Sequence, residues 1–396
     1  MAQLKKSKGL SGLRKNVFVS GLVSFFMDIS SEMIYPLVPL FLANTLGVNK
    51  SVIGLIEGVA ESTASILKVL SGWLSDRIGN RKWLTAAGYA ISTASRPILA
   101  LAPGWRHVMA SRFMDRFGKG VRTAPRDAII ADSTERAFLG RAFGFHRAMD
   151  TMGAMLGPAL AFSILLVFPN NYRLIFWLSI LPGAIAVLLI ILFIEERRGT
   201  EPEGLHRPAP AIMHLNRRFK WFIVIAAIFA LGNSSDAFLI LRAQQLGVSA
   251  REIPIIYLLF NLIYSLSALP AGMAADKFGR RRIIFLGFML FSAVYCGFGT
   301  ARNKTAVWFL FAAYGVFMGL SEGVQKAFVA AIIPPERKAT AFGIYNTIIG
   351  AAMLPASLVG GWLWDHIAPA ATFYFGAATS AVAGISFLIF MAASKN

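Results

Sequence analysis

Residues 72–82 read GWLSDRIGNRK, and residues 272–282 read GMAADKFGRRR. Both stretches fit the pattern G-x-x-x-D-[RK]-x-G-x-[RK], and their aspartates are 276 − 76 = 200 residues apart, about half the chain. Each stretch lies between two long apolar runs. A charged loop that occurs once in each half of the chain indicates an internal repeat of a larger structural unit.

The composition of the chain predicts that lipid, rather than water, surrounds it. Of its 396 residues, 56% are hydrophobic and 15% are charged, and the mean hydropathy is +0.60. A helix that crosses a bilayer needs about 20 residues, so the chain has room for about twelve spans joined by short loops. The apolar runs are longer than the strands of membrane barrels and do not alternate with polar residues. We therefore predict an all-α integral membrane protein.

The apolar runs and the basic segments between them predict the topology. The predicted spans are 17–44, 51–75, 83–103, 106–128, 142–168, 173–194, 221–242, 254–275, 283–300, 306–333, 341–364 and 371–392. Lysine and arginine concentrate in alternate connections, as the positive-inside rule requires of cytoplasmic segments. This pattern predicts a multi-pass protein of a prokaryotic cytoplasmic (inner) membrane, with both termini in the cytoplasm.

The charge and the cysteine content exclude several classes of protein. The net charge of 39 − 20 = +19 could indicate nucleic-acid binding, but the basic residues follow the topology and do not interleave with aromatic residues in one patch. Cys296 is the only cysteine and the histidines are scattered, so we expect no disulfide, metal site or cofactor. The basic start of the chain leads into a long span, and no cleavable signal peptide is expected.

The longest polar segment divides the chain near its middle. It reads EERRGTEPEGLHRPAPAIMHLNRRFK, is rich in proline and charge, and is too short for a regulatory domain. We predict an N-terminal six-helix bundle at 1–195, a cytoplasmic linker at 196–220 and a C-terminal six-helix bundle at 221–396. The sequence Ala-Phe-Gly, at 142–144 and again at 341–343, repeats between the halves like the charged loop.

Two acidic residues lie inside the first predicted span. Asp28 and Glu32 are one helical turn apart and therefore share a face of the helix. An ionisable group inside a membrane is costly unless it is paired or hydrated, so such residues mark functional sites. Two like charges on one face repel, and protonation of one relieves that repulsion, which suits a proton carrier. In the alternative interpretation, one acid only pairs with a basic residue of the fourth span.

The fourth span, 106–128, and the four residues after it carry a basic stripe and three acids. Residues 111–132 read SRFMDRFGKGVRTAPRDAIIAD, and the stripe consists of Arg112, Arg116, Lys119 and Arg122. We predict that Arg112, Asp115 and Arg116 take part in proton coupling or substrate binding. Asp127 and Asp132 lie closer to the cytoplasm, where salt bridges of a conformational gate are the favoured interpretation.

The second half places its intramembrane charges on the seventh and tenth spans. Asp236 lies in the seventh span, and Glu322 and Lys326 lie in the tenth. Glu322 and Lys326 are one turn apart and could simply neutralise each other. We nevertheless include all three among the residues predicted to take part in proton coupling or substrate binding.

The fifth span contains small residues at regular spacing. In GFHRAMDTMGAMLGPALAF, residues 144–162, the motif consists of Gly144, Gly153, Gly157 and Pro158. Glycines at these positions allow close helix approach, although generic packing would explain Gly-x-x-x-Gly alone. His146 and Asp150 share a face of the same span, where they could form a proton relay or a packed hydrogen-bonded pair.

The repeated loop is predicted to act as a conformational gate. Its glycines would allow close helix approach, its aspartates would face the positive N-terminus of an adjacent helix, and Arg77 would form a salt bridge to the fourth span. In the alternative interpretation, the loop only determines topology. The predicted gate residues are Gly72, Asp76, Arg77, Gly79, Arg81, Asp127, Asp132, Gly272, Asp276 and Gly279.

The repeated loop, together with the fourth and fifth spans, resembles the major facilitator superfamily. Arg112 matches the arginine of the family pattern R-x-x-Q-G-x-G in the fourth span, although Asp115 and Arg116 replace its glutamine and first glycine. The glycines of the fifth span fit G-x(8)-G-x(3)-G-P, a motif of proton-coupled efflux antiporters, except that Ala161 and Phe162 replace its final glycines. The resemblance implies two pseudo-symmetric six-helix bundles, a cavity lined by spans one, four, seven and ten, and a role of Arg112 in proton coupling.

The favoured function is a secondary active transporter that works by alternating access. We expect proton-coupled efflux of a small organic or drug-like compound by a monomer in the lipid bilayer. Alternatives are a proton-linked symporter or facilitator, with Arg112 and Arg116 binding an organic anion, and a metal-ion transporter that uses Asp28, Glu32 and Asp236. A membrane-embedded enzyme is disfavoured because no nucleotide-binding motif, H-E-x-x-H motif or Ser-His-Asp grouping is recognisable.

Overall fold

The computed structural model describes residues 15–78, 80–135, 138–196, 217–333 and 338–393. Within these ranges, the side chains of 69, 72–78, 140, 338–340 and 391–393 are not among those described. The described residues are almost entirely helical and contain no strand. The predicted linker at 196–220 lies largely outside the described residues, as does Gly79 of the repeated loop.

The first half of the molecule comprises the helices of residues 15–193. In chain order these are α1 (Lys15–Ile34), a short turn (Tyr35–Leu37), α2 (Val38–Leu40), a wide turn (Phe41–Thr45), α3 (Lys50–Ile78), α4 (Arg81–Leu101), α5 (Trp105–Asp132), α6 (Leu139–Val167), α7 (Tyr172–Leu178) and α8 (Ile180–Phe193).

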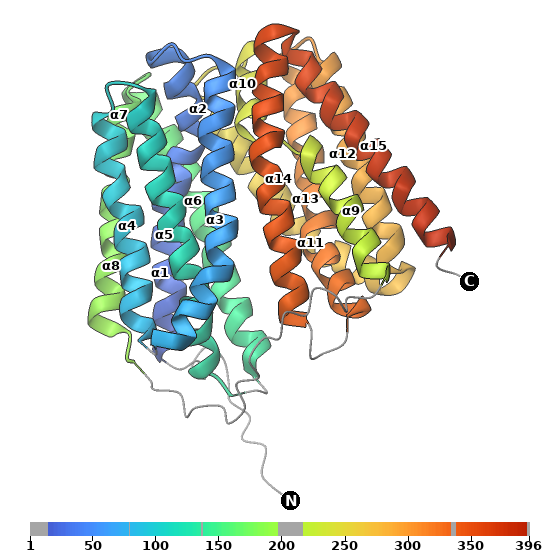
Figure 1. The fold of residues 1–396 in the computed structure, drawn as a ribbon. Helices are drawn as coiled ribbons and strands as arrows, with labels where there is room; N and C mark the ends of the chain where they lie inside the picture. Colours follow the sequence, from blue (N-terminus) through green and yellow to red (C-terminus); the bar gives the residue numbers. More distant parts are fainter. Residues whose placement is uncertain (1–14, 79, 136–137, 197–216, 334–337, 394–396) are drawn as a thin grey trace, which may run out of the picture.

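The second half comprises the helices of residues 217–393. In chain order these are α9 (Arg217–Gly232), α10 (Ala237–Gln245), α11 (Ile253–Phe278), α12 (Arg280–Thr300), α13 (Lys304–Ile332), α14 (Lys338–His366) and α15 (Pro369–Ala393). Figure 1 shows the two halves side by side, with their long helices running roughly parallel and α1 beginning at the lower end.

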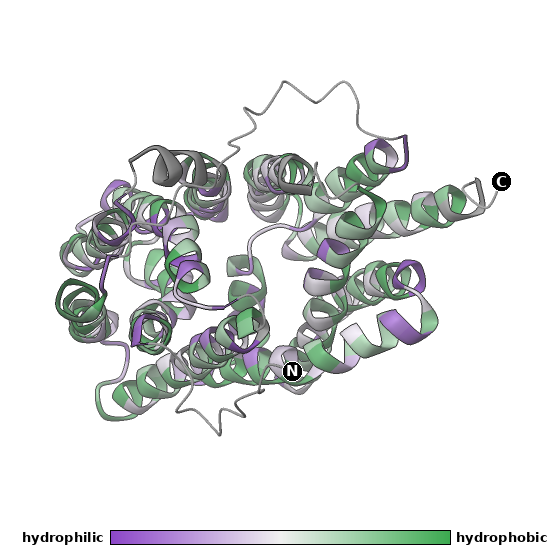
Figure 2. Ribbon diagram, turned by 90° about the horizontal axis from the view of Figure 1, so that it is seen from below, coloured by the Kyte–Doolittle hydropathy of each residue, from purple (hydrophilic) through white to green (hydrophobic). Residues whose placement is uncertain are grey.

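The predicted fold class, an all-α membrane protein, is confirmed. Nine of the predicted spans coincide with one helix each, the sixth and seventh with two helices each, and the first with α1, α2 and the two short turns beside them. Among the described residues, 9 helical segments are long and apolar enough to cross a membrane. The helices α3, α4 and α5 are not in that group, and α5 is polar because it buries charged residues against its neighbours. Figure 2 shows hydrophobic colouring over much of the outer helices and hydrophilic segments at helix ends and between helices.

Two spans are interrupted at corresponding places in the halves. The first span breaks after Ile34, where Pro36 and Pro39 lack the N–H groups that would continue the helical hydrogen bonds. The seventh span breaks at residues 233–235, and the backbone N–H of Ser235 there donates to Ser357 Oγ of α14 at 3.2 Å. Broken helices in transporters expose backbone groups near the middle of the membrane, where substrates and ions bind. The sequence did not lead us to predict these interruptions.

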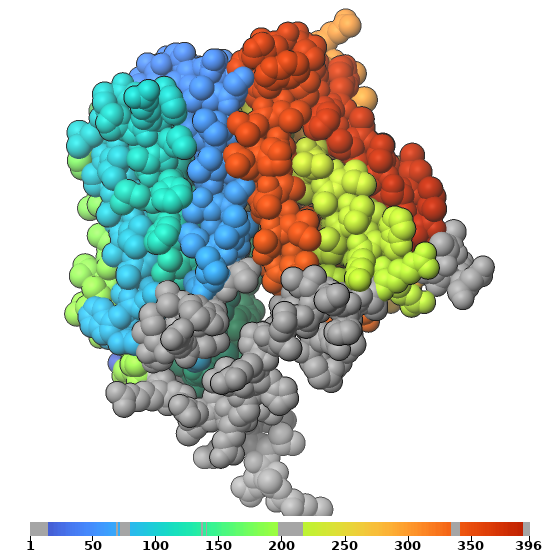
Figure 3. Space-filling model, in the orientation of Figure 1, coloured from blue at the N-terminus to red at the C-terminus, as the bar shows by residue number. Residues whose placement is uncertain are grey.

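The two halves pack closely where α3 meets α14. A Cβ atom added at Gly54 would lie 2.2 Å from the backbone oxygen of Ser357, and the hydroxyl of Ser62 donates to the backbone oxygen of Gly350 at 2.7 Å. These contacts place the two helix backbones directly against each other. Figure 3 shows the same two helices in contact on the face turned to the viewer.

One carboxylate joins the halves at the end of the molecule opposite the start of α1, which we call the Asp365 end. Asp365, near the end of α14, accepts hydrogen bonds from the backbone N–H groups of Lys50 and Ser51 at 3.1 and 2.7 Å. The hydroxyl of Ser51 donates to the same carboxylate at 2.7 Å. An acid at a helix N-terminus is favourable, and here the second half caps a helix of the first. The opposite end, where α1 begins, we call the N-terminal end.

We expect Asp365→Ala to favour separation of the halves at the Asp365 end. Loss of a helix cap typically costs about 1 kcal/mol, which corresponds to about a fivefold change in the closed population. The rate at which a membrane-impermeant thiol reagent labels Val48→Cys, in a Cys296→Ser background, should therefore rise about fivefold. Val48 is buried near this end in the structure.

The matched control for this experiment is Glu252→Ala. Glu252 lies at the same end, but its carboxylate contacts Ser249 and Lys304 of its own half. Its removal should leave the labelling rate unchanged. An equal rise in both variants, or none with Asp365→Ala, would show that the cap does not hold the halves together.

Candidate functional site

Two arginines of α5 form buried ion pairs with two glutamates of α3. Arg112 Nε and Nη2 donate to Glu57 Oε1 and Oε2 at 2.9 and 2.6 Å, a bidentate pair. One helical turn further along, Arg116 Nη2 lies 2.7 Å from Glu61 Oε1. The spacing of one turn on both helices aligns the two pairs side by side. Both arginines were predicted to lie in the cavity, but Glu57 and Glu61 were not identified.

A third buried ion pair connects α4 to α5. Arg96 Nη1 lies 3.1 Å from Asp115 Oδ1, and Arg96 Nη2 donates to Ser31 Oγ of α1 at 3.0 Å. Arg96 is 1% exposed, and sequence reasoning missed it. Three arginines thus pair with three acids: Arg96 with Asp115, Arg112 with Glu57 and Arg116 with Glu61. Such pairing offsets the cost of burying a charge. Arg122, also buried on α5, donates to the hydroxyl of Ser92 instead.

The two predicted acids of the first span have different partners. The carboxyl groups of Asp28 on α1 and Asp150 on α6 lie close enough to interact. Asp150 Oδ1 accepts a hydrogen bond from Ser24 Oγ at 2.8 Å. Two ionised carboxylates in contact repel each other, and a proton on one of them would relieve that repulsion. Within the described part of the chain, Glu32 Oε2 is buried and has no hydrogen-bond partner.

The glycines of the fifth span bring α6 against the acidic face of α1. A Cβ atom added at Gly153 would lie 3.0 Å from the Cβ of Asp28, and one at Gly157 would lie 2.8 Å from the Cβ of Glu32. The predicted close helix approach is therefore confirmed at both glycines. The same prediction is wrong for Gly144, because an added Cβ there would meet no atom within 4 Å. The motif thus acts through the two glycines that face Asp28 and Glu32.

Pro158 and His146 are also on α6. Pro158 lies inside the continuous helix, immediately after the second close-contact glycine. His146 is buried, and its Nε2 atom has no hydrogen-bond partner among the described residues. The expected relay paired His146 with Asp150, whereas Asp150 accepts hydrogen bonds from Ser24 and Arg147.

A chain of polar contacts leads from Asp150 into the second half. Arg147 Nη1 donates to Asp150 Oδ2 at 3.2 Å, and Arg147 Nη2 donates to the hydroxyl of Tyr264 on α11 at 3.0 Å. The Tyr264 hydroxyl donates to Glu322 of α13, and Lys326 Nζ donates to the same carboxylate at 2.9 Å. Glu322 and Lys326 therefore do neutralise each other, as one interpretation of the sequence proposed. We call these five residues the inter-half bridge.

The inter-half bridge borders two cavities towards the N-terminal end. One has a volume of about 410 Å³ and the other of about 210 Å³, and Arg147 and Tyr264 line both. The side chain of Arg147 is 58% exposed, and that of Glu322 is 41% exposed. Volumes of this size exceed the space that one water molecule needs, so the bridge is accessible to water.

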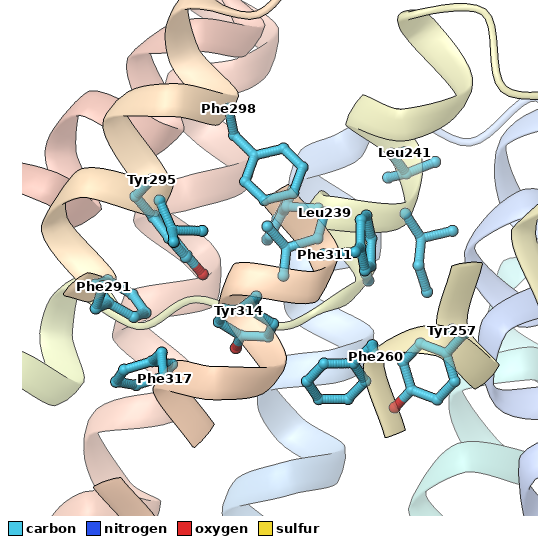
Figure 4. Close-up of a cluster of buried hydrophobic side chains, with 14 of the residues drawn as sticks. Leu239, Leu241, Tyr257, Phe260, Phe291, Tyr295, Phe298, Phe311, Tyr314 and Phe317 are labelled. Atoms are coloured by element: carbon cyan, nitrogen blue, oxygen red, sulfur yellow. The ribbon is translucent and has the colours of Figure 1, made fainter. Parts of the chain in front are cut away.

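A layer of aromatic side chains lies beside the charged cluster and continues into the second half. The ring of Tyr35 lies 5.4 Å from that of Tyr257 in the second half, and the Arg112 and Arg116 guanidinium groups lie 5.4 and 5.6 Å from the Tyr35 ring centre. Figure 4 shows the continuation of this layer: Tyr257, Phe260, Phe291, Tyr295, Phe298, Phe311, Tyr314 and Phe317, with Leu239 and Leu241. Asp236, at the start of α10, accepts a hydrogen bond from the Tyr314 hydroxyl at 2.8 Å.

Only some of the predicted gate residues form contacts of the expected kind. Arg81 forms an ion pair with Asp132, whereas Asp127 pairs with its neighbour Arg126 at 2.9 Å. Sequence reasoning assigned Arg77 as the partner of these acids, but the side chains of Gly72, Asp76 and Arg77 lie outside those described.

In the second copy of the loop, Asp276 lies 3.5 Å from Arg280. The predicted close helix approach at Gly272 is wrong, since an added Cβ would meet no atom within 4 Å and the residue lines the larger cavity beside the bridge. Gly279 has φ +95°, a conformation that favours glycine, and it forms the turn before α12.

Known proteins resemble this chain in sequence and in fold. The family model "Major Facilitator Superfamily" matches residues 21–241 and 221–395. An uncharacterised MFS-type transporter of Methanocaldococcus jannaschii is 36% identical over 382 residues, which cover 95% of both chains. A multi-drug resistance efflux pump PmrA homolog of Lactococcus lactis is 22% identical over 366 residues, which cover 89% of both. The crystal structure of the nucleoside transporter NupG aligns with a TM-score of 0.77 at 14% identity, covering 96% of this chain and 99% of that one.

We expect Gly157→Ala and Gly144→Ala to change stability in opposite directions. At Gly157 a methyl group would meet backbone atoms of Ile29 and Met33 at 2.9 Å, and overpacking of this kind costs about 1–3 kcal/mol. At Gly144 the space is open, and alanine in a helix is more stable than glycine by about 1 kcal/mol. Thermal unfolding in detergent should therefore show a lower midpoint for Gly157→Ala and an equal or higher one for Gly144→Ala. Equal effects of both substitutions would contradict this account of the motif.

Proposed function

The chain belongs to the major facilitator superfamily, and we propose that it exports a small organic compound in exchange for protons. It is a transporter rather than an enzyme. The proposed direction of transport is supported by the glycines of α6, which follow the antiporter spacing, and by a relative that is described as a multi-drug resistance efflux pump. The proposed coupling to protons is supported by the geometry around Asp28.

The observation that carries the proposal is the close approach of Asp28 on α1 to Asp150 on α6, beside the Gly153 contact. Two carboxyl groups this close would share one proton, and Asp150 lines a cavity that is open to water. Release of that proton would leave two negative charges in contact, which is unfavourable unless a cation compensates them. Arg147 and a positively charged part of a substrate are the two candidates. Competition between proton and substrate for one acidic site is the basis of proton antiport.

The inter-half bridge gives this competition a structural consequence. Arg147 contacts both Asp150 and Tyr264, so its two partners lie in different halves. While the carboxyl pair holds its proton, Arg147 can donate hydrogen bonds to both Asp150 and Tyr264. After proton release, the added charge draws Arg147 towards Asp150 and weakens its contact with Tyr264. The protonation state of α1 and α6 thereby controls how firmly α6 and α11 are held together at the N-terminal end.

The geometry favours this function over the alternatives. An organic anion would need free cations, but Arg112 and Arg116 already bind glutamates of α3. A metal ion would need Asp28, Glu32 and Asp236 close together, but Asp28 pairs with Asp150 and Asp236 with Tyr314. Among the described residues, no group of acids, histidines or cysteines is arranged to hold a metal.

We further propose the organisation in which this site operates. The bundles 1–195 and 221–396 move relative to each other, joined by the linker 196–220, in a monomer with both termini in the cytoplasm. The N-terminal end then faces the cytoplasm. The Asp365 end faces outwards and is closed in the state described here. A compound would enter from the cytoplasmic side, and protons from outside would reset the carrier.

We expect Asp28→Asn and Asp150→Asn each to abolish proton-coupled export. Cells loaded with a fluorescent cationic dye should export it when they express the wild type, and an uncoupler should stop that export. Either substitution removes the shared proton site, so export should fall to the level of empty cells.

The matched control is Glu252→Gln, which neutralises an acid at the distant Asp365 end and should export at the wild-type rate. Export by the wild type that persists with the uncoupler would contradict proton coupling. Normal export by both aspartate variants would contradict the assignment of the carboxyl pair. No export by any form would favour the organic-anion alternative, which uptake of a labelled organic acid would test.

A further inference from the structure

The row of ion pairs between α3 and α5 ends towards the N-terminal end of the molecule. On α5, Lys119 continues the face that carries Arg112 and Arg116, because positions i, i+4 and i+7 of a helix align. On α3, each partner glutamate lies 55 residues before its arginine, since 112 − 57 = 55 and 116 − 61 = 55. The same offset places Ala64 level with Lys119. The basic row of α5 therefore extends beyond the acidic row of α3.

The next charged residue on that face of α3 is itself basic. Lys68 follows Glu61 by 68 − 61 = 7 residues, which is close to two helical turns. The helices pack closely here, since a Cβ atom added at Gly120 would lie 2.5 Å from the Cβ of Leu67. Lys68 and Lys119 adjoin these two residues in sequence, and their charges interact. We call Lys68 and Lys119 the lysine pair.

The lysine pair has no acidic partner in the described part of the chain. Both side chains are exposed, and no described carboxylate forms an ion pair with either of them. A charged side chain within a membrane span faces the interior of the bundle or water rather than lipid. Glu322 and Lys326 of the second half are within electrostatic range of Lys68. The lysine pair therefore faces the boundary between the halves.

Buried groups without hydrogen-bond partners lie beside the lysine pair. Arg116, one turn before Lys119, has no acceptor for its buried Nε atom among the described residues. Glu32 has a buried Oε2 atom that likewise lacks a described donor, and Lys119 is within electrostatic range of both Glu32 and Asp28. Buried polar groups of folded proteins normally have partners. Unmet donors and an unmet acceptor in one region point to a ligand that carries both a negative and a positive group.

We propose that the exported compound is a zwitterion whose carboxylate binds Lys68 and Lys119. Its ammonium group would lie at Glu32 and the Asp28–Asp150 pair, where the proposed function already requires a cation. The inference rests on that function, because it names the class of the exported compound. A compound with only negative charge would not replace the proton on the acidic pair. A compound with only positive charge would leave the lysine pair without a partner.

The test compares two dyes that differ in this charge. Rhodamine 110 carries a free carboxylate beside its cationic ring system, and rhodamine 123 is its methyl ester. Fluorescence anisotropy measures the binding of each dye to the purified full-length protein in detergent at constant pH. The wild type should bind rhodamine 110 about tenfold more tightly than rhodamine 123, roughly threefold for each lysine in contact with the carboxylate. Lys68→Gln/Lys119→Gln should lose this preference while its affinity for rhodamine 123 does not fall.

Two further double variants serve as controls. Lys68→Arg/Lys119→Arg keeps both charges and should keep the preference for rhodamine 110. Arg251→Gln/Arg302→Gln removes two exposed positive charges from the Asp365 end and should bind both dyes like the wild type.

Equal loss of the preference in both glutamine variants would show a general charge effect and overturn the lysine site. Weaker binding of both dyes to Lys68→Gln/Lys119→Gln would show that the lysines maintain the structure, which would overturn their role as ligands of a carboxylate. A wild type that binds rhodamine 110 no more tightly than rhodamine 123, or not at all, would overturn the zwitterion. The expected preference without proton-coupled export would support the lysine site and contradict the proposed function alone.

Discussion

A charge buried within a bundle that lipid surrounds must have a partner, and this constraint determines the arrangement of the first half. Arg112 and Arg116 on one helix meet Glu57 and Glu61 on the next at matching one-turn spacing. These pairs hold α3 and α5 in register. The same α3 packs against α14 of the other half, so the charged cluster also supports the contact between the halves. We therefore propose that the cluster is a rigid support rather than a binding site for substrate.

The acidic pair that we propose to carry the proton lies next to this cluster. The glycines at 153 and 157 bring α6 so close to α1 that the carboxyl groups of Asp28 and Asp150 can interact. Arg147, one turn from Asp150, then reaches Tyr264 across the boundary between the halves. In the proposed account, the ion-paired cluster keeps the helices in place, and the exchange of a proton on the acidic pair would give the transporter two states.

The sequence predicted the fold well because its signals were local. Long apolar runs and a loop repeated after 200 residues are visible without tertiary information, and Asp28 and Glu32 stand out because acids are rare in such runs. The same reasoning could have identified Glu57, Glu61 and Arg96. It could not have identified their partners, because those depend on how neighbouring helices are rotated. The pairing of Asp150 with Asp28, and the open space at Gly144 and Gly272, depend on tertiary packing in the same way.

The central claim is that the proton on the Asp28–Asp150 pair controls the contact between α6 and α11. Phe143 and Met273 are exposed on these two helices. Spin labels at these two positions would report the distance between the helices in double electron–electron resonance spectroscopy. For the wild type, we predict a longer distance at mildly alkaline pH than at mildly acidic pH, because proton release draws Arg147 away from Tyr264. Asp28→Asn, which mimics the protonated pair, should keep the short distance at both. A distance that changes with pH equally in the wild type and in Asp28→Asn would contradict the account.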